Sequence, residues 1–264
     1  MKTMFDLHGK VAVITGATGM LGKNMAKALT EQGCDLVLAS RSKEKAEVLS
    51  AELSGAYGVR TLPFVWDAQD RASIDRLAKE SHAWQGHVDI LINNAGGNRT
   101  TSAADLLERS DEDIEYVIKV NLLSPLFCCR AFLRIMKEQK NGSVINIGSI
   151  AGVVGRDRRL YKETGSNEQL VDYVAAKGGV ISMTRDLAAK MAPYGIRVNT
   201  ISPGGFSHGT SQKFQQLYGE RTPAGFMGRA DKDIGGAAVF LASDEGAYVN
   251  GHNLLVDGGF SIWK

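Results

Sequence analysis

Short hydrophobic runs rich in Val, Ile and Leu alternate along the chain with longer segments whose apolar residues recur at helical spacing. The runs have the composition of buried β-strands and cover residues 10–15, 35–39, 59–65, 88–93, 143–148, 196–202 and 253–257. The helical segments fall near residues 20–32, 43–54, 70–83, 111–138, 168–191 and 231–242. This alternation predicts parallel strands joined by helical crossovers.

Several of the strand segments are apolar throughout, which indicates burial on both faces of the sheet. The sequence therefore predicts an α/β fold with a doubly wound, seven-stranded parallel sheet of the Rossmann type. No repeat, low-complexity tract or Pro/Gly-rich linker divides the 264 residues, so we expect a single domain over residues 1–264. Two polar stretches, near 155–169 and 203–228, are predicted to be surface loops that cover the substrate.

Composition and charge add few constraints. The 31 basic and 29 acidic residues are interspersed and give a net charge of +2, so no nucleic-acid surface is indicated. No apolar run approaches the roughly 18 residues that cross a bilayer, and the first residues lack a signal-peptide pattern. We expect a cytoplasmic protein without a membrane partner. The three cysteines, two of them adjacent (Cys128 and Cys129), are expected to be buried thiols, and the histidines lack metal-ligand spacing, so no metal is expected.

The first strand ends in TGATGMLG, Thr15 to Gly22, directly before a helix. Glycines in this position let backbone N–H groups approach a pyrophosphate at the helix N-terminus. The second strand ends in Ser40 and Arg41, without the acidic residue that holds ribose hydroxyls, and Asp35 lies too early to replace it. A hydroxyl followed by a guanidinium suits a 2′-phosphate. NADP(H) is therefore the expected cofactor, and NAD(H) is the alternative if Arg41 is only a solvated residue.

Tyr173 and Lys177 lie four positions apart in the helical segment DYVAAKGGVISMTRDLA, so their side chains share one face. An ammonium fixed near a phenol favours the phenolate and brings the tyrosine pKa toward the range useful for proton transfer. None of the other six tyrosines has a lysine four residues later. The pair is a candidate proton-transfer site, and two side chains on a solvated helix face are the alternative.

Seven motifs follow one another along the chain. They are TGATGMLG (15–22), NNAG (93–96), Asn121, INIGSIAG (145–152), YVAAK (173–177), SPGG (202–205) and NLLVDGG (253–259). In this order the chain resembles the short-chain dehydrogenase/reductase family from end to end, and it is similar to the gluconate- and mannonate-type sugar-acid oxidoreductases of that family. The resemblance implies a nicotinamide cofactor and hydride transfer.

The resemblance also implies four catalytic residues. Tyr173 would protonate a carbonyl oxygen as hydride arrives, or act as the base in the reverse direction. Lys177 would lower the tyrosine pKa and bind the nicotinamide ribose. Ser149 would hold the carbonyl or alkoxide oxygen by a hydrogen bond. Asn121 would support a water through which Lys177 exchanges protons with solvent.

The cofactor contacts implied by the resemblance come from several strand ends. The glycine-rich turn would hold the pyrophosphate, the end of the third strand the adenine, and the end of the fourth strand the adenosine-side ribose. The implied residues, with the two predicted for the 2′-phosphate, are Gly16, Thr18, Leu21, Gly22, Ser40, Arg41, Asp67, Ala68, Asn94, Ala95, Gly96, Tyr173, Lys177 and Gly204.

Two departures from the family pattern bear on the site. Met20 stands where most relatives have a glycine, which indicates a reshaped turn and is shared with some sugar-acid reductases of the family. Ser149 and Tyr173 are also farther apart than in most relatives, so residues 155–169 (GRDRRLYKETGSNEQ) resemble an insertion near the site. Its charged and hydroxyl groups favour a polyhydroxylated or carboxylated substrate. The candidates for a carboxylate clamp are Arg156, Arg158 and Arg159, and a solvated loop or subunit contact is the alternative.

The sequence thus predicts an NADP(H)-dependent oxidoreductase for a keto or secondary hydroxyl group of a sugar, sugar acid or similar polar small molecule. As in relatives, a homodimer or homotetramer is expected. A 3-oxoacyl thioester reductase is the alternative substrate class, and a non-catalytic NADP(H)-binding sensor is the alternative of another class. GFSHG (205–209), with Asp244 and His252, matches a serine-hydrolase pattern, but Ser207 is expected in a loop where a nucleophile elbow needs a strand-to-helix turn.

Overall fold

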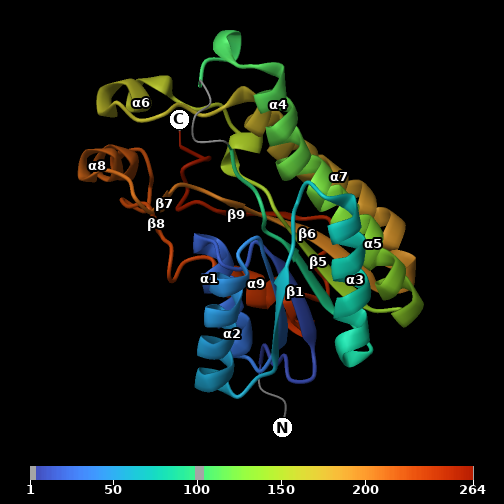
Figure 1. Cartoon of the computed structure of the whole chain (residues 1–264). Helices are drawn as coiled ribbons and strands as arrows, with labels where there is room; N and C mark the ends of the chain where they lie inside the picture. Colours follow the sequence, from blue (N-terminus) through green and yellow to red (C-terminus); the bar gives the residue numbers. More distant parts are fainter. Residues whose placement is uncertain (1–3, 99–103, 264) are drawn as a thin grey trace.

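The computed structural model describes residues 4–98 and 104–263. Seven parallel strands form one sheet in the order β3-β2-β1-β4-β5-β6-β9 (Figure 1). They are β1 (Val11–Thr15), β2 (Asp35–Ser40), β3 (Thr61–Val65), β4 (Ile90–Asn93), β5 (Gly142–Ile147), β6 (Ile196–Pro203) and β9 (Asn253–Val256). The chain winds outward from β1 to β3 and then returns to β4, so the strand order reverses between β1 and β4. Ligands of such sheets bind at this switch point, beyond the carboxyl ends of the strands.

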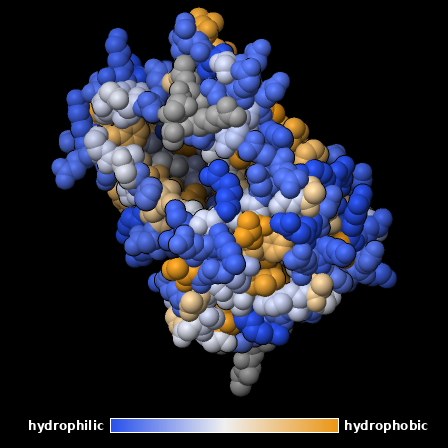
Figure 2. Space-filling model, in the orientation of Figure 1, coloured by the Kyte–Doolittle hydropathy of each residue, from blue (hydrophilic) through white to orange (hydrophobic). Residues whose placement is uncertain are grey.

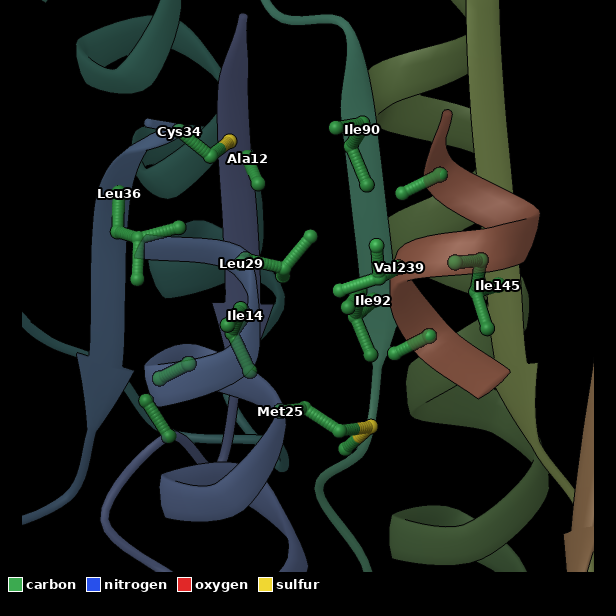
Figure 3. Packing of buried hydrophobic residues seen from close by; sticks show 14 of the residues in the cluster. Ala12, Ile14, Met25, Leu29, Cys34, Leu36, Ile90, Ile92, Ile145 and Val239 are labelled. Carbon is green, nitrogen blue, oxygen red and sulfur yellow. The ribbon is translucent and has the colours of Figure 1, made fainter. Parts of the chain in front are cut away.

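All seven predicted strands are present, and the predicted doubly wound parallel sheet is confirmed. One face of the sheet is covered by α1 (Met20–Thr30), α2 (Lys43–Tyr57) and α9 (Gly235–Ala242). Figure 3 shows Leu29 of α1 and Val239 of α9 packed close to side chains of β1 and β4 in this layer. The other face is covered by α3 (Arg71–Gln85), α5 (Ser124–Gln139) and α7 (Val171–Met191). Burial of strands on both sides explains why their sequences are apolar throughout.

The predicted helix over 111–138 is one helical run with a π-helical turn inside it. It consists of α4 (Asp111–Ile118), the π segment η2 (Lys119–Leu123) and α5. By length and composition alone this run could cross a membrane, contrary to the expectation that no apolar run is long enough. However, 56% of its most apolar window is buried, with Phe132 and Met136 inside the core. It is therefore a core helix of the sheet.

The two stretches predicted as loops contain regular structure. Residues 155–169 include α6 (Arg158–Thr164), and residues 203–228 include most of a two-strand pairing, β7 (Phe206–Ser207) with β8 (Gly228–Arg229), and α8 (Gln212–Glu220). Both helices have side-chain N-caps, Asp157 and Ser211. They lie side by side beyond one end of the sheet (Figure 1) and pack through an aromatic cluster of Tyr161, Phe214 and Tyr218.

Four 3₁₀ turns complete the described structure. They are η1 (Leu106–Glu108), η3 (Ile150–Gly152), η4 (Ala192–Tyr194) and η5 (Asp244–Gly246). The surface in Figure 2 is mostly hydrophilic, and hydrophobic side chains occur there in small groups. This agrees with the interspersed charges of the sequence.

Candidate active site

The turn between β1 and α1 depends on close backbone packing. Gly16 has a φ of 64°, in the left-handed region, and its carbonyl oxygen accepts a hydrogen bond from Asn94 Nδ2 at 2.9 Å. A Cβ at Gly22 would lie 2.4 Å from the same oxygen, so no side chain fits there. Gly19 is the N-cap and Met20 the first residue of α1, with no positive φ at either position. The turn therefore needs no glycine at Met20, contrary to the expected reshaping.

A cleft of about 500 Å³ opens along this turn, over the switch point of the sheet. It brings together nearly all the residues that the sequence predicted for the cofactor. Those lining it are Gly16, Thr18, Leu21, Ser40, Arg41, Asp67, Ala68, Asn94, Ala95 and Gly96. Gly22 lies beneath the turn instead and lets α1 approach it. The glycine-rich turn, which precedes the N-terminus of α1, thus forms part of the cleft lining, where backbone N–H groups can bind an anion.

The end of β2 presents hydroxyl groups and cations to this cleft. The Ser40 hydroxyl lies 2.8 Å from the Thr18 hydroxyl, and Arg41 is exposed beside it. Lys45, in the first turn of α2, lines the same cleft and was not predicted, although it is four residues after Arg41. Asp35, at the opposite end of the strand, is engaged with Arg60 at 2.7 Å. Arg41 and Lys45 thus line the cleft beside the N-terminus of α2.

A second cleft of about 470 Å³ contains all four predicted catalytic side chains, and Gly204 also lines it. Asn121 comes from the π turn η2, Ser149 from the N-cap of η3, and Tyr173 and Lys177 from α7. Met20, Leu21, Asn94, Gly96, Gly97 and Asn98 line both clefts. The two clefts are therefore parts of one groove.

Tyr173 is half-buried in this groove. Burial raises its pKa above the ordinary value, whereas a hydrogen bond with Ser149 and the positive charge of Arg156 lower it. Lys177 was expected to lower this pKa, but its ammonium lies 5.6 Å from the centroid of the phenol ring and donates to the Ile147 carbonyl at 2.7 Å. The net direction is upward because desolvation of the phenolate is the largest effect.

Lys177 itself is only 3% exposed. Burial lowers the pKa of its ammonium to about 8, because the charged form loses hydration. Its neighbour Gly96 leaves the necessary room, since a Cβ there would lie 3.6 Å from the Lys177 nitrogen and 2.7 Å from Asn121 Oδ1. A glycine after β4 thus allows the lysine and the asparagine to approach the same point.

Asn121 is fully buried and fixes the segment after β4 to the helix. Its Oδ1 accepts from the Gly97 N–H at 3.1 Å, and its Nδ2 donates to the Gly97 carbonyl at 2.7 Å and to the Val117 carbonyl at 2.9 Å. The π turn widens the helix at this point and is common at functional sites. The observed contacts of Asn121 are thus with backbone, and its water-supporting role stays a prediction.

The profile of the family described as enoyl-(acyl carrier protein) reductase matches residues 16–261, which is nearly the whole chain. The chain belongs to the short-chain dehydrogenase/reductase family. Members bind a nicotinamide cofactor and act on small molecules, and this chain is accordingly an oxidoreductase of CH–OH groups. The predicted family is confirmed.

Relatives within the short-chain dehydrogenase/reductase family have different substrates. The chain is 35% identical over 266 residues to 2-dehydro-3-deoxy-D-gluconate 5-dehydrogenase of Formosa agariphila, covering 97% of this chain and 94% of that protein. It is 33% identical over 260 residues to 3-oxoacyl-[acyl-carrier-protein] reductase of Thermotoga maritima, covering 97% and 99%. Among solved structures, a gluconate 5-dehydrogenase of Burkholderia cenocepacia in complex with NADP and tartrate matches with a TM-score of 0.88 and 32% identity, covering 98% of each chain.

The three arginines proposed as a carboxylate clamp have different surroundings. Arg156 lines the catalytic groove. Arg158 pairs with Glu168 at 3.3 Å, and exposed Arg159 pairs with Asp157 at 2.9 Å, so neither guanidinium is directed at a substrate. The clamp prediction therefore holds for at most one residue.

Several lining residues were not predicted as site residues. They are Tyr161, Asn167, Glu168 and Gln169 from the insertion at 155–169, Leu170 at the N-cap of α7, and Phe206 from β7. The length of the insertion after Ser149 was the available signal for the first four. Ser207, the candidate hydrolase nucleophile, lies in β7 and donates to the Gly228 carbonyl at 3.3 Å. It is not at a strand-to-helix turn, so the structure gives no nucleophile elbow.

Proposed function

We propose that this chain is an NADP(H)-dependent oxidoreductase for a keto or secondary hydroxyl group of a sugar, sugar acid or similar polar metabolite. The observation that carries the proposal is the single groove in which the glycine-rich turn and the group Asn121, Ser149, Tyr173 and Lys177 share a lining. A dinucleotide along this groove has its adenosine end at β2 and its reactive end beside α7.

The preference for NADP(H) is supported by Arg41 and Lys45 at the end of β2. Both can bind a 2′-phosphate, and α2 begins beside them with Ser42 as its N-cap. Gly16 and Gly22 leave the turn open to pyrophosphate. Cofactor contacts are proposed for the predicted residues that line the groove, with Lys45 added to them. NAD(H) is the alternative.

The proposed chemistry assigns a proton to Tyr173. When bound, the nicotinamide donates hydride to the carbonyl carbon or accepts it from the alcohol carbon. In reduction, Tyr173 gives its phenolic proton to the carbonyl oxygen, and the phenolate then regains a proton from solvent; oxidation reverses these transfers. Ser149 is placed to hydrogen-bond the same oxygen and Tyr173. Lys177, with a pKa near 8, can exchange protons near neutral pH.

A polar substrate is supported by the residues that precede α7 in the lining of the groove. Asn167, Glu168 and Gln169 are among them, and their amide and carboxylate side chains match hydroxyl groups better than an acyl chain. A second candidate is reduction of a 3-oxoacyl thioester, favoured by the similarity to the Thermotoga maritima reductase. The third alternative is an NADP(H)-binding sensor without turnover.

Self-association and location complete the proposal. Leu123 and Leu126 are partly exposed where η2 meets α5, as expected if the long helices pack against a second copy. We infer a homodimer or homotetramer. A cytoplasmic location is supported by three free, buried cysteines, the usual state in a reducing compartment.

The test is consumption of NADPH and NADH with 5-dehydro-D-gluconate, other keto sugars and acetoacetyl thioesters. We expect turnover of a sugar-type substrate, faster with NADPH. Arg41→Ala should weaken NADPH binding by about 10- to 100-fold, the loss of one charge-assisted contact, with little effect on NADH. Lys43→Ala is the matched control, because Lys43 lies two residues after Arg41, at the start of α2, and pairs with Glu47. Turnover of thioesters alone, or of no carbonyl compound, would contradict the proposal in favour of the respective alternative.

A further inference from the structure

Arg156 and Lys177 are the two cationic side chains, among the described residues, that line the second cleft, where the predicted catalytic residues lie. Arg156 lies two residues before the start of α6 and is half-buried. Its guanidinium carbon is 4.8 Å from the ring centroid of Phe260, 5.6 Å from that of Tyr218 and 6.0 Å from that of Tyr161. Three rings from separate parts of the chain thus hold this side chain by cation–π contacts.

No carboxylate in residues 4–98 or 104–263 forms an ion pair with Arg156, and its further polar contact is a hydrogen bond with Tyr218. The two neighbouring arginines of the segment are both neutralised by acids. Aromatic faces stabilise a guanidinium but leave the N–H groups at its edge available. Arg156 therefore has donors in the groove that the protein does not fully use.

The positive charge of Arg156 also acts on the reacting end of the groove. It is among the influences that lower the pKa of Tyr173, so the guanidinium lies close enough for its field to reach the phenol. Ser149, Tyr173 and Arg156 line the same groove. A substrate oxygen between Ser149 and Tyr173 would leave the rest of a short chain within reach of the guanidinium.

We infer that Arg156 binds the carboxylate of the substrate, which narrows the substrate class to hydroxy or keto sugar acids. A planar guanidinium takes a carboxylate in two parallel hydrogen bonds. The aromatic seat limits the motion of the side chain, so less conformational freedom is lost on binding. This inference rests on the proposed function, because it identifies the substrate class of the same groove.

The alternative role of Arg156 is structural, in holding α6, α8 and the C-terminal segment together through its ring contacts. The two roles differ in what they predict for neutral substrates. Loss of a structural contact would lower kcat/KM for acids and alcohols alike, whereas loss of a carboxylate ligand would lower it only for acids. The matched pairs D-gluconate with D-glucitol, and D-galactonate with D-galactitol, differ in the carboxylate and otherwise keep the same hydroxyl groups.

The experiment measures kcat/KM for both pairs with NADP⁺, using wild type, Arg156→Met, Arg156→Lys and Arg159→Met. We expect wild type to prefer the acids, and Arg156→Met to lower kcat/KM for the acids by about 10- to 100-fold while alditols change little. The kcat/KM of Arg156→Lys for the acids should lie between those of wild type and Arg156→Met, because an ammonium keeps the charge but cannot donate two parallel hydrogen bonds. Arg159→Met is the control in the same segment. It should leave both classes unchanged, because Arg159 is exposed and bound to Asp157.

Three outcomes overturn the inference. Equal losses for acids and alditols in Arg156→Met would show a structural role, and wild type without a preference for acids would remove the carboxylate site. Both leave the proposed function intact. Turnover of neither class, together with no reduction of 5-dehydro-D-gluconate or the other keto sugars, overturns the proposed function and the carboxylate assignment together. If Arg156→Met does not fold, as judged by circular dichroism, the acid-to-alditol ratio of Arg156→Lys decides between the two roles.

Discussion

Lys177 is a buried cation whose placement has a cost in stability. It is 3% exposed and donates to one backbone carbonyl, and no acid of the described residues forms an ion pair with it. The folded state therefore favours the neutral amine, and the pKa falls from 10.5 to about 8. A group placed for chemistry commonly carries such a perturbed pKa.

The pH dependence of stability tests this burial. Because the folded pKa of Lys177 lies below the unfolded value, the unfolded state binds more protons between pH 8 and 10.5, and stability gains from this residue as pH rises. The shift corresponds to an upper bound of roughly 3 kcal/mol. Relative to Lys177→Met, wild type should therefore be less stable at pH 7 and should recover toward pH 10.

Urea unfolding of both proteins at pH 7 to 10 measures this difference, and other titrating groups cancel in the comparison. A difference in the free energy of unfolding that stays constant over this range would mean that Lys177 has an ordinary pKa.

At the scale of elements, α7 is held at its N-terminus by a buried ion pair. Arg109, which follows η1, lies 2.7 Å from Asp172, and both side chains are at most 2% exposed. Asp172 also accepts a hydrogen bond from the Tyr173 N–H at 3.1 Å. A second tie, from Asn146 of β5 to Thr184, fixes the middle of the helix to the sheet at 2.9 Å. These contacts set the position of Tyr173 along the groove.

Asp172→Asn should lower the free energy of unfolding by about 3 kcal/mol, because it removes one charge of an ion pair whose two side chains are buried. It should also lower kcat through Tyr173 while NADPH affinity stays near the wild-type value. Asp75→Asn is the control, since it removes a surface pair with Arg71 and should change stability by less than about 1 kcal/mol. Equal effects of the two substitutions in urea unfolding would contradict the stability contribution of the buried pair, and a wild-type kcat for Asp172→Asn would contradict its positioning role.

Some elements of the fold can be predicted from the sequence. The strands are apolar on one or both faces and the helices that cover the sheet are apolar on one face, so the spacing of apolar residues identifies them. Helices α6 and α8 were missed because Tyr161 and Phe214 pack against each other and not against the sheet. The π turn at Asn121 was also missed, since apolar spacing continues through it. Their formation depends on contacts between segments far apart in sequence.

At the scale of the whole molecule, the parallel sheet gathers residues from distant motifs at one edge. Strand order predicts that the glycine-rich turn, Asn94 and Ser149 meet there, because each follows the carboxyl end of a strand. The sequence could therefore indicate in advance which motifs line the groove. It could not show that Arg156 lines the groove while Arg158 and Arg159 do not. It also could not show that burial raises the pKa of Tyr173 more than its neighbours lower it. Both depend on the three-dimensional surroundings of the side chain.

The central claim is that Tyr173 exchanges a proton with the substrate oxygen. The most direct measurement is the steady-state kcat of Tyr173→Phe with NADPH and the best keto substrate, together with the Kd for NADPH. We expect kcat to fall by about 10²- to 10⁴-fold, the usual contribution of a positioned acid, while the Kd changes little. Tyr57→Phe, which removes a hydroxyl that contacts Glu31 on the surface, should behave as wild type. A Tyr173→Phe enzyme that keeps most of the wild-type kcat would contradict the account.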